Sequence, residues 1–176
     1  KTGEANRNVS CTVNSHPNEN RTLYDCTVNM QYYDAAGTWG INVTAQDINQ
    51  ALAYNDTTSF VYNQLKAFVR TPATISWGTI YLGDVGIEAV QNTTMNNTGN
   101  VAVSQINMTA HKLTGQTIAT QTLGPGNFSI NITHLAGNGN RMIESTPVSI
   151  SGATLPRGAP GSNQASLFYY LDLPFL

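Results

Sequence analysis

The sequence predicts an all-β protein: an antiparallel β-sandwich or jelly roll of about ten strands, with Ig-like or jelly-roll topology. Apolar and polar residues alternate with a period of two in short segments along the whole chain, as on strands that bury one face. Clusters of Gly, Pro, Asn and Asp separate these segments at regular spacing, and helical periodicity is almost absent.

The N-terminal part predicts three strands. Residues 9–13 and 28–33 alternate apolar and polar side chains, and a turn is expected at residues 34–37. Residues 38–44 follow as a third strand, with Trp39 and its alternate neighbours on one face.

Residues 46–63 are less regular. Residues 47–54 predict a short helical turn capped by Asp47, and residues 60–71 return to a strand pattern. We expect residues 1–176 to form one continuous β-sandwich unit, with the best candidate for a subdomain seam near residues 70–74, at Pro72.

Residues 74–113 are expected to organise the fold. Residues 75–81 and 101–110 both show strand alternation, and the turn between them, residues 97–100, has residue types that tolerate positive φ. Three further strands are expected at residues 128–132, 142–150 and 167–171.

The composition indicates an extracellular structural domain. Charged residues make up 10% of the chain, against about 25% in an ordinary soluble domain, and the net charge is −2. This balance argues against binding nucleic acid or an acidic membrane surface. No apolar run approaches the ~20 residues of a membrane-spanning helix, so no membrane span is expected. The chain starts at Lys1 without an initiator Met, and we interpret it as a mature secreted form whose signal peptide has been removed.

The two cysteines, Cys11 and Cys26, are expected to form a disulfide. A turn-rich run lies between two strand-like segments, so a hairpin would bring the cysteines within bridging distance. Closing a loop of this size stabilises a fold by roughly 3 kcal/mol. The alternative is two free buried thiols.

Asn-X-Ser/Thr sequons are the strongest functional signal. The chain has 20 Asn, and chance would give roughly three or four sequons at this Ser and Thr content, yet there are nine. They lie on the expected polar faces of strands or in loops, as a glycan requires. The alternative is that polar strand faces are simply rich in Asn and Thr. The nine candidate N-glycosylation sites are Asn8, Asn20, Asn42, Asn55, Asn92, Asn96, Asn107, Asn127 and Asn131.

No residue pattern indicates catalysis, a cofactor or a metal. The three histidines, His16, His111 and His134, have no partner at metal-ligand spacing. Asp56 and Asp84 lack the run of oxygen ligands that a calcium loop needs. We therefore expect a protein that is not an enzyme.

Several motifs resemble secreted archaeal cell-surface proteins. These motifs are residues 26–34 with Gly37-Thr38-Trp39, Trp77-Gly78 with Gly83, and residues 97–100, 155–158 and 169–174. The resemblance implies a glycosylated surface-layer or extracellular filament subunit. A looser likeness is to jelly-roll subunits of archaeal bundling pili and bacterial biofilm fibres, in which an N-terminal strand of one subunit completes the sheet of the next.

The sequence and the resemblance together favour a structural N-glycosylated protein that polymerises with itself into a pilus-like filament or a surface lattice. Strand donation would use residues 1–13, with Val9, Cys11 and Val13, and the apolar terminus at Phe175 and Leu176 would be a second assembly element.

The alternative function is an adhesin or carbohydrate-binding module. Its aromatic platform would consist of Tyr33, Phe168 and Tyr170, provided that these side chains lie outside the core.

Overall fold

The computed structural model describes residues 6–7, 9–19, 21–134, 137 and 139–173. Within these residues the protein is nearly all-β, with no α-helix and one 3-10 turn, η1, at Pro125–Asn127. The chain divides into two compact units, Lys1–Leu65 (unit 1) and Lys66–Leu176 (unit 2).

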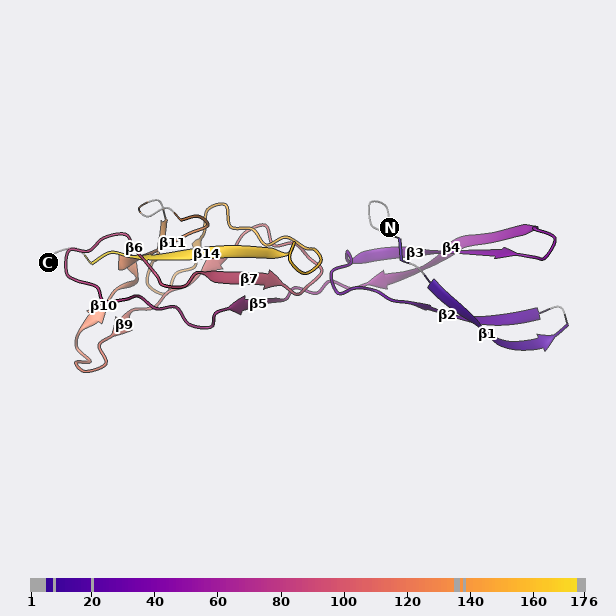
Figure 1. The fold of residues 1–176 in the computed structure, drawn as a ribbon, viewed down its shortest axis with the longest axis horizontal. Coiled ribbons are helices and arrows are strands. Elements are labelled where there is room, and N and C mark those ends of the chain that lie inside the picture. The colour runs from indigo at the N-terminus through magenta and orange to yellow at the C-terminus, as the bar shows by residue number, and fades with distance from the viewer. Residues whose placement is uncertain (1–5, 8, 20, 135–136, 138, 174–176) are drawn as a thin grey trace. The chain divides into compact units, whose positions relative to one another are not determined.

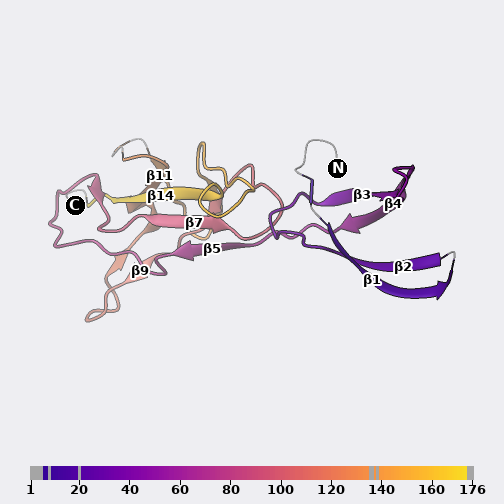
Figure 2. The same cartoon turned by 45° about the vertical axis from the view of Figure 1, so that its right-hand side comes forward.

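Unit 1 consists of two hairpins, each a two-stranded antiparallel sheet, which Figures 1 and 2 show as separate ribbons. The first ribbon pairs β1 with β2, and the second pairs β3 with β4. Their strands are β1 (Val9–Asn18), β2 (Arg21–Val28), β3 (Gly37–Gln46) and β4 (Leu52–Tyr62).

The predicted helical turn after Asp47 is wrong. The Oδ1 atom of Asp47 accepts hydrogen bonds from the backbone N–H groups of Asn49 and Ala51, both at 2.8 Å. The Asp47 side chain therefore accepts backbone hydrogen bonds, as a capping residue does, but the turn that it stabilises connects β3 to β4. Long strand pairing on both sides of the turn overrides the weak local preference for a helix.

Unit 2 is built on a six-stranded sheet in the order β12-β11-β14-β7-β5, with β6 also paired to β14. Two small sheets, β10-β9 and β13-β8, complete its pairing. The strands are β5 (Phe68–Thr71), β6 (Ile87–Glu88), β7 (Thr93–Asn97), β8 (Asn107–Met108), β9 (Leu113–Thr114), β10 (Thr122–Leu123), β11 (Phe128–Asn131), β12 (Asn140–Arg141), β13 (Val148–Ser149) and β14 (Gln164–Leu171).

Strand β14 organises unit 2. It pairs with β11, β7 and β6, and in Figure 1 it lies beside β7 and β11. The expectation that residues 74–113 organise the fold is wrong, because residues 75–81 form no strand. Trp77 is partly buried against the core, and its indole Nε1 donates to the Ile87 carbonyl at 3.0 Å. The alternation of residues 75–81 therefore reflects an extended segment on the core, not a ladder.

Unit 2 contains an apolar core. All the buried members of this core belong to residues 66–176. The side chains come from strands and from loops between them. The buried members are Ala89, Met95, Ile106, Ile130, Met142, Ile150, Ala153, Leu155, Leu167 and Tyr169.

A pair of buried asparagines fixes the end of β7. The Asn97 amide nitrogen donates to the carbonyls of Val101 at 2.8 Å and Pro156 at 3.1 Å, and its Oδ1 accepts from Gly99 N–H at 2.9 Å. Asn163 donates through Nδ2 to the Asn97 carbonyl at 2.5 Å. The predicted turn at residues 97–100 thus exists, and buried amides hold it.

The all-β, antiparallel part of the fold prediction is confirmed, whereas the sheets are smaller and more numerous than in a sandwich of ten strands. The unit boundary falls between Leu65 and Lys66, whereas the predicted seam lies near residues 70–74 and the predicted domain is continuous. The physical reason is that the strand just before Pro72, β5, pairs with β7 and so belongs to unit 2.

Candidate functional site

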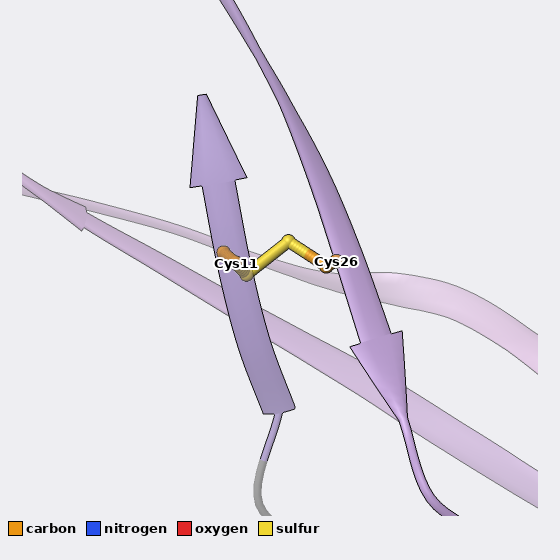
Figure 3. Close-up of a disulfide and its surroundings, with 2 residues drawn as sticks. All are labelled: Cys11 and Cys26. Carbon is orange, nitrogen blue, oxygen red and sulfur yellow. A yellow bond between two sulfur atoms is a disulfide. The ribbon is translucent and has the colours of Figure 1, made fainter. Parts of the chain in front are cut away.

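The β1–β2 ribbon carries the predicted disulfide. Cys11 and Cys26 face each other in the strand register, with a Cα–Cα distance of 4.1 Å and bonded sulfur atoms 2.12 Å apart. Figure 3 shows the bond crossing directly from one strand to the other. The disulfide therefore fixes the register of a ribbon whose described residues are all exposed.

An apolar face runs along this ribbon on both sides of the disulfide. Val9 pairs with Val28 and Val13 pairs with Tyr24, so their side chains share the face of the two cysteines. Val13 is 50% exposed and Tyr24 is 60% exposed. We call this surface, defined by Val9, Cys11, Val13, Tyr24, Cys26 and Val28, the ribbon face.

The two ribbons of unit 1 meet at a cleft of about 350 Å³. Val9 and Val28 of the ribbon face line it, together with Trp39 and Phe60 of the second ribbon. Trp39 is buried, and its indole Nε1 donates to the Ala35 carbonyl at 2.8 Å. Only this end of each ribbon is covered, so the rest of the ribbon face lies open to solvent.

A partly buried ion pair lies at the covered end. Asp34 is 2% exposed and binds the guanidinium of Arg7, whose Nε lies 2.8 Å from Asp34 Oδ2. The hydrogen bond to Asp34 raises the pKa of Arg7, which therefore remains charged. Tyr33 lies beside the guanidinium, with 5.9 Å between Arg7 Cζ and the centre of the tyrosine ring. Sequence reasoning missed this pair, because its members lie 27 residues apart without a motif.

The residues predicted to mediate assembly differ in their structural context. Val9, Cys11 and Val13 already belong to a disulfide-linked hairpin, so they are not a free N-terminal strand. The predicted donation of residues 9–13 to another subunit therefore does not agree with the structure, because it would require these residues to break their pairing with β2. Phe175 and Leu176 lie outside the described residues.

Of the seven sequon asparagines that the structure describes, four are exposed: Asn42, Asn55, Asn92 and Asn107. Asn96 and Asn127 are half-buried, and Asn131 is only 9% exposed. The expectation that every strand sequon points to solvent is therefore wrong at Asn131. Asn8 and Asn20 lie outside the described residues.

Asn131 lies on an inner strand of the sheet. β11 has neighbours on both sides, β12 and β14, and Asn131 itself pairs with Phe168 of β14. Earlier on the same strand the packing is close, since a Cβ atom added at Gly139 would come within 2.9 Å of the Ser129 hydroxyl. Ile132, the last residue of the predicted strand 128–132, is 36% exposed.

The aromatic platform is not formed as predicted. Phe168 and Tyr170 are 7% and 2% exposed, since both belong to the central strand β14. Tyr33 is half-buried beside Arg7. These three side chains therefore do not form one solvent-facing surface.

A polar cluster at Asp172, unforeseen from the sequence, joins three parts of unit 2. Its Oδ1 accepts from Gly86 N–H at 2.6 Å, and its Oδ2 accepts from Arg141 Nη2 at 2.6 Å. The Asp172 carbonyl accepts from Asn127 Nδ2 at 2.8 Å. An open cavity of about 540 Å³ lies beside these groups. Every acceptor named has a partner inside the protein, which indicates a structural role.

The histidines lie apart from one another. His134 packs against Phe168 with its ring tilted by 50° and 3.9 Å between ring centres, and its Nδ1 lies 2.8 Å from Glu88 Oε1. His111 neighbours Ser145, and His16 neighbours Thr22. Nowhere in the described part of the chain do three His, Cys, Asp or Glu side chains gather as metal ligands do.

Among the described residues, none forms a helix long and apolar enough to cross a membrane. Comparison with known proteins finds no family model, no curated protein and no solved structure that matches this chain.

Proposed function

We propose that this chain is a structural, N-glycosylated protein of the cell surface whose copies assemble into an extracellular filament or a surface lattice. The observation that carries the proposal is the ribbon face, an exposed apolar surface on a disulfide-linked, two-stranded sheet.

A two-stranded ribbon with one exposed apolar face is poorly stabilised on its own. Isolated hairpins are marginally stable in water, and sheets gain stability from further strands or from packing of the apolar face. In the described residues β1 pairs only with β2, which leaves an edge of backbone N–H and C=O groups on each strand. Such an edge is a template for another strand.

A second copy of the same chain is the occupant that fits this surface. The ribbon face consists of Val, Tyr and a disulfide, so two copies related by a two-fold axis would bring apolar side chains against apolar side chains. A net charge of −2 produces little repulsion between copies. A two-fold contact joins copies only in pairs, so growth into a polymer uses a second contact, edge-to-edge strand addition, with β1 remaining in its hairpin.

The second ribbon carries two exposed sequons, Asn42 on β3 and Asn55 on β4. Glycans on these two residues would cover part of that ribbon. The sequons that adjoin the first ribbon, Asn8 and Asn20, lie outside the described residues.

The test compares two double substitutions that add the same charge to opposite faces of one ribbon. Val13→Lys with Val28→Lys places two charges on the ribbon face. Thr12→Lys with Thr27→Lys places them on the other face, where Thr12 pairs with Asp25 and Thr27 pairs with Ser10. The disulfide holds the hairpin in both variants.

We expect the wild type and the Thr12/Thr27 variant to assemble, and the Val13/Val28 variant to stay monomeric. Sedimentation velocity measures the assembly state, and electron microscopy distinguishes filament from lattice. If both variants assemble equally, the ribbon face is not the surface through which copies make contact. A monomeric wild type in its glycosylated form would overturn assembly altogether.

The adhesin alternative loses the observation that favoured it, since Phe168 and Tyr170 lie in the core. We therefore advance no second function.

A further inference from the structure

We infer that the sequons fall into two classes: Asn42, Asn55, Asn92 and Asn107 carry glycan, whereas Asn127 and Asn131 are unmodified structural amides. The inference rests on the proposed function and specifies which sites of the glycoprotein are used. Asn96, half-buried on β7, and the two sequons outside the described residues are not assigned.

N-glycosylation replaces one N–H bond of the side-chain amide with a bond to the anomeric carbon of a sugar. The sugar comes from an activated glycosyl phosphate, whose carbon–oxygen bond breaks as the phosphate leaves with the electron pair. The amide nitrogen gives up one proton in exchange. A usable site therefore needs an accessible Nδ2 atom and open space for the sugar.

Asn55 meets both requirements. Its Oδ1 accepts from the backbone N–H of Thr57 at 2.9 Å and from the Thr57 hydroxyl at 2.7 Å. Both bonds use the oxygen, so they fix the amide while Nδ2 remains accessible on the exposed strand β4. The sequon is therefore held in one conformation with its nitrogen presented to solvent.

Asn42, Asn92 and Asn107 share the exposure of Asn55. No described residue forms a hydrogen bond with the side-chain amide of any of the three. Asn107 also illustrates the strand geometry, since it belongs to β8 at the surface while the preceding residue, Ile106, is buried in the core. A sugar on these nitrogens breaks no hydrogen bond among the described residues.

Asn127 fails on accessibility of the nitrogen. Its Nδ2 donates to the Asp172 carbonyl at 2.8 Å, and the Asp172 N–H donates to the Asn127 carbonyl at 2.8 Å. This reciprocal pair joins the start of β11 to the chain that follows β14. A sugar on Asn127 would alter the nitrogen through which this amide holds the two segments together.

Asn131 fails on space. It is 9% exposed, its strand neighbour is Phe168, and its Oδ1 accepts from the Ile132 N–H at 2.8 Å. A glycan at this position is incompatible with β11 in its observed place in the sheet.

The experiment maps glycan occupancy by glycopeptide mass spectrometry on folded protein from its own cells. Thr109→Ala and Thr133→Ala provide a matched pair, because each removes a sequon through an exposed threonine and leaves the asparagine intact. We expect Thr109→Ala to lower the intact mass by the glycan of Asn107. We expect Thr133→Ala to remove only the mass difference between Thr and Ala.

The outcomes separate the two proposals. Glycan at Asn127 or Asn131 overturns this inference and leaves the glycoprotein function standing. An unmodified Asn42, Asn55, Asn92 or Asn107 overturns the assignment at that position. Absence of glycan from every sequon overturns the glycoprotein function, and this inference with it.

Discussion

Two neighbouring asparagines on β7 have opposite environments. Asn97 is 1% exposed and uses its amide to hold the turn after the strand, through three hydrogen bonds. Asn96 is half-buried and belongs to a sequon. One of the two asparagines is thus a structural brace, and its neighbour is a candidate for modification.

The pair predicts a large difference in stability between two similar variants. Asn97→Ala leaves two carbonyls and one N–H without their buried partner, so we expect it to lower the free energy of unfolding of unit 2 by about 2–4 kcal/mol. Asn96→Ala is the control, with an expected change below about 1 kcal/mol. Urea unfolding followed by Trp77 fluorescence, in a Trp39→Phe background, measures both. Equal effects of the two substitutions would contradict the bracing role of Asn97.

The β1–β2 ribbon is the element that depends most on a covalent bond. Every described residue of its two strands is exposed, so little buried apolar surface holds it together. The disulfide joins positions 15 residues apart in sequence and directly opposite in register. It therefore limits the unfolded states available to the hairpin.

We expect Cys11→Ser with Cys26→Ser to destabilise this ribbon by about 3 kcal/mol. Hydrogen exchange of the β1 and β2 amides measures the loss, and the amides of β7 and β14 in unit 2 provide the internal control. Unchanged protection of β1 and β2 would show that contacts other than the disulfide hold the hairpin. In the wild type, reduction should add the mass of about two hydrogens.

Local alternation in the sequence predicted β3 and β14 well. The pattern places both strands in the chain, but it does not give their burial: residues 167–171 of β14 are buried on both faces, and Val43 of β3 is exposed. It failed at residues 75–81 because an extended segment packed on a core alternates without pairing. It also failed at Asn131, because which segment covers a strand's polar face depends on tertiary structure.

The candidate site was predictable to a similar extent. The cysteine pair follows from its spacing and from the flanking strand patterns. The Arg7–Asp34 pair joins residues 27 positions apart in the sequence, and the Asn97–Asn163 hydrogen bond joins residues 66 positions apart. No local sequence pattern predicts partners at such separations. The ribbon face needed the strand register, which places Val13 opposite Tyr24.

At the scale of the whole molecule, the two units differ in how they are stabilised. All ten members of the buried core cluster lie in unit 2. Among the described residues of unit 1, the buried apolar side chains are Ala35 and Trp39, supported by an ion pair and a disulfide. Unit 2 has the stabilising interactions of an independent domain, whereas unit 1 has little buried apolar surface and relies on a covalent bond.

This difference predicts the behaviour of the separated halves. We expect residues 66–176 alone to unfold cooperatively, with the near-ultraviolet circular dichroism of packed aromatic side chains. We expect residues 1–65 to show protected amides only while the disulfide is intact. Circular dichroism and hydrogen exchange with and without reductant provide the measurement. A disordered 66–176 fragment would contradict the assignment of a self-sufficient core.

The position of β14 in the chain sets the order in which unit 2 can form. β5, β6, β7 and β11 all precede it, and three of these four pair with it directly. While residues 164–171 are still inside the ribosome, the earlier strands lack the partner that joins them, and their apolar side chains stay exposed. Unit 1, whose hairpins pair only locally, can form first. A chain that is exported while it is being made would therefore cross the membrane with unit 2 still unfolded, which is the state that a narrow translocation channel accepts.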